Sequence, residues 1–150
     1  MNMDLDTVAK LARPYYTDHN LDVSDIKKYL LVVDNARHRV NTFSEMPEES
    51  YMFYNDLDIS TDSLDLVSGN TAQKLLKAIH ASLIRQTDCN GDQFKDIVMM
   101  VGNSLGVKGK DLFFPIRTAL YGDPMGPDIP HVYSILGRDE TLNRLSMVIK

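Results

Sequence analysis

Histidine and cysteine, the residues that most often hold metals or attack substrates, are few and scattered in this chain. No histidine has another histidine or a cysteine three or four positions away; the four are His19, His38, His80 and His131. Because zinc sites use such ligands at close, regular spacing, the sequence predicts no metal site. Cys89 is the single cysteine and lies in an expected turn without a neighbouring base, so we expect no nucleophilic thiol.

Two further segments resemble ligand-binding loops only in part. Asp88, Asn90 and Asp92 have the spacing of a calcium-binding loop, but Gln93 and Met99 stand where that loop requires Gly and Glu. We therefore interpret this segment as a turn between helices with a helix N-cap. The glycines before the basic segment 107–111 lack the spacing of a phosphate-binding loop, and no Ser or Thr follows a lysine there. The sequence thus predicts no catalytic residue and no cofactor.

Length, charge and composition are those of an ordinary globular chain. Its 150 residues are 43% hydrophobic and carry a net charge of −5, with −7 on residues 1–70 and +2 on residues 71–150. The second half is the better surface for a polyanion, although such an asymmetry also suits a merely solvated protein. No apolar segment approaches the ~20 residues of a membrane span. The acidic segment 1–6 lacks the apolar region of a secretory signal, and a lone cysteine suits a reducing compartment, so we expect a cytoplasmic protein without a membrane partner.

Apolar residues recur at helical spacing along the chain, and alternating strand-like patterns are missing. The spacing predicts helices near 5–13, 24–37, 47–54, 71–86, 94–105, 113–121, 130–137 and 139–149. Pro14 should end or kink the first helix near Arg13, and Thr42 to Glu45 has the pattern of a capping box. We predict an all-α fold, an irregular bundle or cage of short and medium helices. It divides into helical subdomains 1–68 and 69–150, with the acidic segment 56–63 as the best candidate for the join.

An ordered set of motifs is more specific. Segment 106–122 reads G-V-K-G-K-D-L-F-F-P-I-R-T-A-L-Y-G, and G-P-D-I at 126–129, I-L-G-R-D-E at 135–140 and N-R-L at 143–145 follow it. Earlier, K-L-A-R-P-Y stands at 10–15, R-V-N-T-F-S-E-M at 39–46 and M-F-Y-N-D at 52–56. In this order the segments resemble the C-terminal anticodon-binding region of bacterial glutamyl-tRNA synthetases, which are class I aminoacyl-tRNA synthetases. The resemblance extends over nearly the whole chain.

The resemblance implies a helical domain that binds tRNA with a glutamate-type anticodon and is not itself an enzyme. The family's nucleotide-binding catalytic half, with its H-I-G-H-like and K-M-S-K-like motifs, has no counterpart in this sequence. The chain is therefore either a fragment of an ATP-dependent glutamate–tRNA ligase or a free-standing relative, and a synthetase catalytic domain in cis or in trans is a candidate partner. Tyr121 stands where the family usually has Thr, and Pro124 alters the loop before Gly126. In a free-standing chain the binding role could have changed.

Carried onto this sequence, the resemblance gives the tRNA-reading role to two arginines, Arg117 and Arg39. An arginine can donate two parallel hydrogen bonds to the edge of an unpaired base. Arg117 follows Pro115 on a short helix, and its structural alternative is an ion pair with Asp111 or Asp128. Arg39 belongs to the segment 39–46, and its alternative is a solvated helix C-terminus, where arginine is favourable.

Four further residues complete the predicted tRNA site. Pro127 and Ile129 would form a small apolar shelf for a base, or else only close the loop and pack in the core. Lys108 and Lys110 would contact phosphates and set affinity without reading sequence, or else are solvated surface. A second hypothesis for the whole chain is a helical protein-interaction or regulatory domain that has kept this fold and lost tRNA binding. The acidic first half slightly favours that hypothesis.

Overall fold

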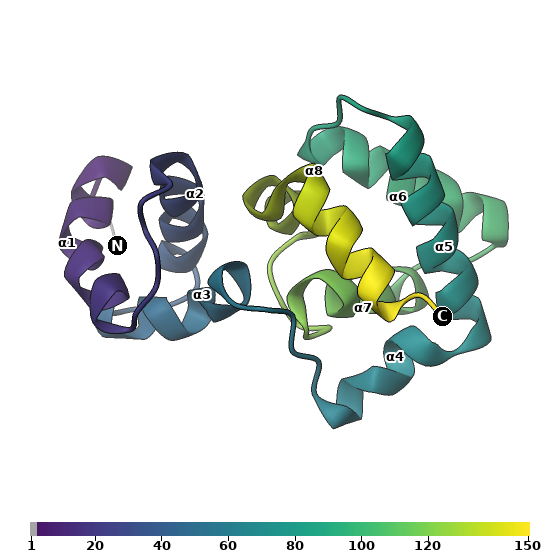
Figure 1. Ribbon diagram of the computed structural model, residues 1–150, viewed down its shortest axis with the longest axis horizontal. Helices are drawn as coiled ribbons and strands as arrows, with labels where there is room; N and C mark the ends of the chain where they lie inside the picture. The colour runs from purple at the N-terminus through teal and green to yellow at the C-terminus, as the bar shows by residue number, and fades with distance from the viewer. Residues whose placement is uncertain (1–2) are drawn as a thin grey trace. The chain divides into compact units, whose positions relative to one another are not determined.

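The computed structural model describes residues 3–150; Met1 and Asn2, part of the acidic segment 1–6, lie outside the described residues. These residues form eight α-helices and two short 3₁₀ helices (η1 and η2), and no strand occurs among them. The expected all-α class is confirmed. In chain order (Figure 1) the elements are α1 (Leu5–Asp18), α2 (Ile26–Arg37), η1 (Phe43–Glu45), α3 (Met46–Tyr54), η2 (Thr61–Ser63), α4 (Leu64–Ser68), α5 (Asn70–Arg85), α6 (Gly91–Leu105), α7 (Lys110–Tyr121) and α8 (Ile129–Val148).

The chain divides into two compact units, Met1–Asp56 and Leu57–Lys150. The division falls inside the acidic segment 56–63, which we expected to join two subdomains. Residues 57–68, expected in the first subdomain, belong instead to the second unit, because α4 packs against α5 and α7 and buries Val67. The short helix α4 has little apolar pattern of its own, so only its packing reveals to which unit it belongs.

Tyrosines hold the three helices of the first unit together. Tyr16 of α1 is fully buried, and its hydroxyl hydrogen-bonds the Ser50 hydroxyl of α3 at 2.8 Å. Tyr29 of α2 donates to the carbonyl of Ala9 in α1 at 2.5 Å. Desolvation by burial raises the pKa of Tyr29 to about 12 and also raises the pKa of Tyr16. The folded first unit therefore favours the neutral, protonated form of both tyrosine side chains.

Two local predictions for the first unit are wrong: that the first helix ends near Arg13, and that residues 42–45 form a capping box. A kink at Pro14, the alternative to an end there, stays a prediction. Helix α1 continues through Pro14 to Asp18, because the buried side chain of Tyr16 anchors its last turn to α3 beyond the proline. The segment 42–45 does not form a capping box: the Thr42 hydroxyl donates to the Glu45 carboxylate at 2.7 Å, and neither caps a backbone N–H. In both places the local structure follows a side-chain contact and differs from what the sequence pattern predicts.

The second unit is built on the two long helices that the apolar pattern predicted. The stripe of α5 is fully buried at Leu75, Leu76, Ile79 and Leu83. Helix α6 begins at a capping box between Asn90 and Gln93, so the segment that resembles a calcium loop is a helix N-cap, as expected. It ends at Gly106, whose φ of 70° is the left-handed conformation that glycine adopts most readily. Helices α7 and α8 pack on this pair.

The loop between α7 and α8 is fixed at both ends. Helix α7 stops at Gly122, with a φ of 85°, and α8 begins with Pro130 in its first turn. Gly137, with a φ of 79°, interrupts α8 where we expected one helix to end and another to begin. Buried Arg144 donates to the carbonyl of Leu120 at 2.7 Å and so ties α8 to the last turn of α7. The segment 123–128 is therefore a short loop between anchored helices.

Within residues 3–150, no helix has both the length and the apolar character that a membrane span requires.

Candidate nucleic-acid interface

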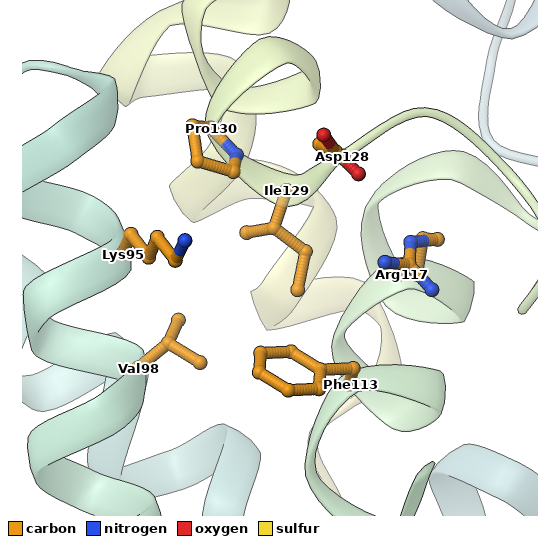
Figure 2. A pocket seen from close by; sticks show the side chains of 7 residues that line it. All are labelled: Lys95, Val98, Phe113, Arg117, Asp128, Ile129 and Pro130. Atoms are coloured by element: carbon orange, nitrogen blue, oxygen red, sulfur yellow. The ribbon is translucent and has the colours of Figure 1, made fainter. Parts of the chain in front are cut away.

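A pocket of about 210 Å³ lies in the second unit among α6, α7 and the start of α8 (Figure 2). Its apolar part consists of buried Val98 and Ile129 together with half-buried Phe113. Its charged groups are Lys95 of α6, Arg117 of α7 and Asp128, the N-cap residue directly before α8. The seven residues that line it, here called the α6–α8 pocket, are Lys95, Val98, Phe113, Arg117, Asp128, Ile129 and Pro130.

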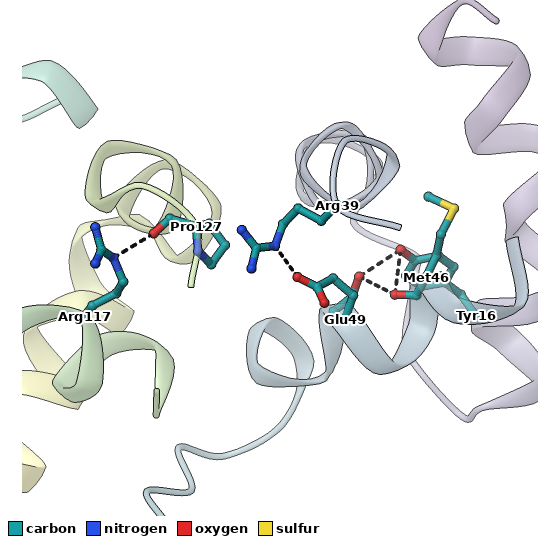
Figure 3. A network of polar contacts seen from close by, with 7 residues as sticks. Tyr16, Arg39, Met46, Glu49, Arg117 and Pro127 are labelled. Atoms are coloured by element: carbon teal, nitrogen blue, oxygen red, sulfur yellow. Dashed lines mark hydrogen bonds and ion pairs between the residues drawn. The ribbon is translucent and has the colours of Figure 1, made fainter. Parts of the chain in front are cut away.

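Arg117, the first of the predicted tRNA-binding residues, lies at this pocket and holds the α7–α8 loop. Its Nε donates to the carbonyl of Pro127 at 3.1 Å (Figure 3), and its Nη1 donates to the carbonyl of Pro124 at 3.1 Å. None of the ion pairs among the described residues includes Arg117, so the alternative of a bond to Asp111 or Asp128 is not what the structure contains. The guanidinium is half-buried and fixed by backbone carbonyls.

The loop can approach α7 this closely because of a glycine. A Cβ placed on Gly126 would lie 2.6 Å from Cδ2 of Tyr121, a separation that real side chains do not adopt. The backbone of residue 126 therefore lies directly on the Tyr121 ring, which is itself buried. This contact brings the carbonyls of Pro124 and Pro127 within reach of Arg117. The conformation that orients the guanidinium thus depends on a small residue at position 126.

The two residues predicted as an apolar shelf have different places. Ile129 is 3% exposed and forms part of the apolar lining of the pocket. Pro127 is buried too, but it does not line the pocket, and its carbonyl accepts a hydrogen bond from Arg117. The apolar surface at the pocket consists of Ile129 with Val98 and Phe113, whereas Pro127 acts in closing the loop.

The two predicted phosphate-binding lysines are both exposed, near the N-terminus of α7. Lys108 lies in the segment before the helix, and Lys110 is its first residue. Nζ of Lys110 is 5.8 Å from the ring centroid of Phe114, a cation–π contact at an exposed site. Neither lysine lines the pocket. Their placement leaves both ammonium groups accessible to a solvated phosphate.

Arg39 belongs to the first unit, where it follows α2. Its Nε donates to the carboxylate of Glu49 in α3, an ion pair drawn in Figure 3. The expected alternative, a solvated helix C-terminus, is therefore replaced by an ion pair between neighbouring helices. The Arg39 side chain is still 37% exposed, so the guanidinium remains accessible from solvent while Glu49 orients it.

Five of the seven pocket residues were not among the predicted site residues: Lys95, Val98, Phe113, Asp128 and Pro130. Lys95 occupies an ordinary polar position on an amphipathic helix, and Phe113 looks like core. Asp128 stands at the N-cap of α8 but makes no side-chain capping hydrogen bond there. An aspartate directly before a helix suggests capping from sequence alone, so its unused carboxylate becomes evident only in the structure.

No group of three or more His, Cys, Asp or Glu side chains suited to a metal ion occurs within residues 3–150. Arg138, in the segment 135–140, donates to the carbonyls of Leu83, Ile84 and Gln86 at the end of α5. This arginine caps a helix C-terminus.

Known proteins share this fold and sequence pattern. The chain is 28% identical to the glutamate–tRNA ligase of Carboxydothermus hydrogenoformans over 96% of its length and 29% identical to that of Bacillus cereus over 97%. It spans only 31% of the length of each of these relatives. A solved glutamate tRNA ligase from Elizabethkingia meningosepticum matches 97% of the chain with a TM-score of 0.84, and one from Elizabethkingia anophelis matches 99% with 0.82. At 18% identity, these two likenesses concern the fold.

A family model described as the anticodon binding domain matches residues 7–149, which include every element of both units apart from the first turn of α1. The relatives and this family model confirm the family resemblance inferred from the sequence. The chain therefore belongs to the anticodon binding domain family and is related to glutamate–tRNA ligases.

Proposed function

We propose that this protein binds tRNA and recognises a glutamate-type anticodon with the surface around Arg117 and the α6–α8 pocket. The observation that supports this most is the geometry of Arg117: a half-buried guanidinium held by two backbone carbonyls beside a pocket with an apolar lining. The relatives of the chain are named glutamate–tRNA ligases, which agrees with this choice of RNA.

The physical basis is a preorganised donor next to a stacking surface. Two of the five N–H groups of the Arg117 guanidinium are used by the carbonyls of Pro124 and Pro127, so the remaining ones point in fixed directions. Unpaired anticodon bases expose their edges to such donors and their faces to apolar or aromatic side chains. Because the guanidinium is already ordered, little conformational entropy is lost when it binds.

The other predicted residues have supporting roles in this proposal. Lys108 and Lys110 are exposed near the start of α7 and contact phosphates, which strengthens binding of any RNA equally. Arg39, oriented by Glu49, contributes a second guanidinium from the first unit. With a net charge of −5, the chain must bind RNA through such local cations and not through a general positive field.

We further propose that the protein acts together with the catalytic part of a glutamate–tRNA ligase, in cis or in trans, and does not itself join glutamate to tRNA. The share of the relatives that the chain spans, 31%, supports a role as one part of such an enzyme. Recognition of the anticodon then selects the tRNA, while the chemistry takes place elsewhere.

The test is direct binding of RNA to the purified chain. Fluorescence anisotropy with a labelled anticodon stem-loop of glutamate tRNA should give saturable binding, and a stem-loop with the same stem but another anticodon should bind more weakly. Equal affinities for the two RNAs, or no binding of either, would reject anticodon recognition. Absence of binding to either RNA would leave the helical interaction domain without RNA binding as the remaining hypothesis.

A further inference from the structure

Helix α1 of the first unit carries apolar side chains on two faces. Val8, Ala12 and Tyr16 are buried in the core of the unit. Leu11 and Tyr15, one turn apart on a neighbouring face, are 45% and 39% exposed. A surface helix of a globular protein normally buries one apolar face and keeps the rest polar. The core of the first unit therefore accounts for only one of the two apolar faces of α1.

Aromatic side chains of η1 and α3 extend the exposed face. The Tyr15 ring stacks with that of Phe43, with centroids 6.1 Å apart and planes 24° apart. His19 lies one turn after Tyr15, at the C-cap of α1, and its ring centroid is 6.2 Å from that of Tyr51. Tyr51 is 36% exposed and Phe43 is half-buried. These four residues and Leu11 form one surface of the first unit, here called the α1–α3 strip.

Three exposed acidic residues lie along this strip. Asp18 directly precedes His19, Glu45 is the last residue of η1, and Glu48 is three positions before Tyr51, on the same side of α3. Asp18 and Glu48 take part in no hydrogen bond or ion pair among the described residues. Unpaired carboxylates beside exposed rings attract a cation and repel a phosphate.

Basic side chains nearby do not offset this charge. The two cations of α1, Lys10 and Arg13, lie on other faces of the helix by helical spacing, and the charge of Arg13 acts on Tyr29 of α2. Neither η1 nor α3 contains a basic residue, and Arg39 is paired with Glu49. The strip therefore suits a cationic partner.

We propose that the α1–α3 strip is a docking surface for a segment of another protein that carries arginine and apolar side chains. A guanidinium stacks on an aromatic ring and can at the same time donate two parallel hydrogen bonds to a carboxylate. Tyr15 and Tyr51 supply exposed rings, and Asp18 and Glu48 supply the carboxylates. Leu11 adds an apolar contact one turn before Tyr15.

Single-stranded RNA is the other kind of partner that stacks on exposed rings. Surfaces that bind it combine such rings with a positively charged groove. The α1–α3 strip has acidic neighbours instead, so phosphates bound there would lie beside Asp18, Glu45 and Glu48. The docking surface belongs to the first unit and is independent of the RNA surface proposed at Arg117, so a failure of RNA binding there would leave it standing.

The test uses the full chain and two labelled peptides of equal length. One contains arginine, leucine and serine, and the other has lysine in place of each arginine. Backbone amide shifts of the isotopically labelled chain should change most within residues 11–19 and 43–51 when the arginine peptide is added. Fluorescence anisotropy should show that the arginine peptide binds at least about threefold more tightly than its lysine twin, because an ammonium group lacks the planar face that stacks.

Tyr15→Ala and Glu48→Gln each remove one half of the contact. Each should weaken binding of the arginine peptide by about twofold to fivefold. Leu31→Ala and Asp6→Asn are the matched controls and should bind as the parent does. Leu31 is a 36% exposed apolar side chain on α2, and Asp6, like Glu48, is an exposed carboxylate in the first turn of its helix, but on the far side of α1 from the strip by helical spacing. Thermal melting checks that Tyr15→Ala is folded, while Glu48→Gln leaves the packing of the unit unchanged.

Several results would overturn the proposal. Equal affinities for the two peptides, shift changes outside residues 11–19 and 43–51, or no binding of the arginine peptide would reject the docking surface. The same holds if Glu48→Gln binds the arginine peptide as Asp6→Asn does. If an unstructured oligouridylate displaces the arginine peptide and itself binds more weakly to Tyr15→Ala, the strip is an RNA surface and the protein partner is rejected.

Discussion

Replacing Arg117 tests whether one side chain both orders the α7–α8 loop and contacts RNA. In Arg117→Ala the carbonyls of Pro124 and Pro127 lose their donor. Each such bond contributes about 0.5–1.5 kcal/mol, so the variant should lose about 1–3 kcal/mol of unfolding free energy. For a domain of the size of unit Leu57–Lys150, each kcal/mol lowers the melting temperature by about 4–8 °C. Differential scanning calorimetry measures this change.

The same variant should lose RNA affinity and discrimination. A bidentate contact from arginine to a base contributes about 1–3 kcal/mol, so binding of the glutamate stem-loop should weaken by about fivefold to 150-fold. Binding of an anticodon-swapped stem-loop should weaken less, because that RNA does not offer the matching edge. Arg117→Lys keeps the charge but cannot reproduce the planar fork, so it should resemble Arg117→Ala in discrimination.

Arg85→Ala is the control for charge. Arg85 is exposed at the end of α5 and its Nε donates only to the carbonyl of Ala81 in its own helix, at a long 3.4 Å. This variant should melt close to the parent and keep its preference between anticodons. If Arg117→Ala melts like Arg85→Ala and binds both stem-loops as the parent does, the role assigned to Arg117 is refuted.

Three further changes have clear expected results. Lys110→Ala should weaken binding of all stem-loops equally and reduce the slope of log affinity against log salt by about 0.7–1, and an unchanged slope would contradict a phosphate contact. Gly126→Ala places a Cβ against the Tyr121 ring, so it should destabilise the second unit by about 1–3 kcal/mol and weaken stem-loop binding; a melting curve and an affinity equal to the parent's would show that the close approach is not required. Burial raises the pKa of Tyr29 to about 12 and raises the pKa of Tyr16 and Tyr54, so the folded first unit favours neutral phenols. Its stability should be complete below the unfolded pKa of about 10 and fall as the pH rises from there through the folded pKa values. Urea unfolding followed at about pH 9 and about pH 11.5 measures this, and equal midpoints would contradict it.

Local patterns predicted most of the helices because the signals that start and stop them are local. The apolar stripe of α5, the cap at Asn90 and the glycines at 106 and 122 each act within a few residues. The sequence-based prediction was wrong where a contact between residues far apart in the sequence determined the structure. Tyr16 holds α1 together beyond Pro14, and the packing of α4 on α5 and α7 assigns residues 57–68 to the second unit.

The candidate site was predictable only in part for the same reason. The motif around Arg117 is contiguous, so the residue could be named from sequence, and Ile129 with it. Its partners, the carbonyls of Pro124 and Pro127, depend on how the loop folds back over Tyr121. The pocket joins residues from α6, α7 and α8, and the sequence spacing between Lys95 and Asp128 says nothing of their proximity.

The central claim is that RNA binds at the surface formed by α7, the α7–α8 loop and the start of α8. Titrating the isotopically labelled chain with the glutamate anticodon stem-loop, while following backbone amide chemical shifts, tests it most directly. We expect the largest shift changes between residues 108 and 130, with Lys95 of α6 among the affected residues. Changes confined to other surfaces of the second unit, or no change at concentrations where the RNA is in excess, would contradict the account.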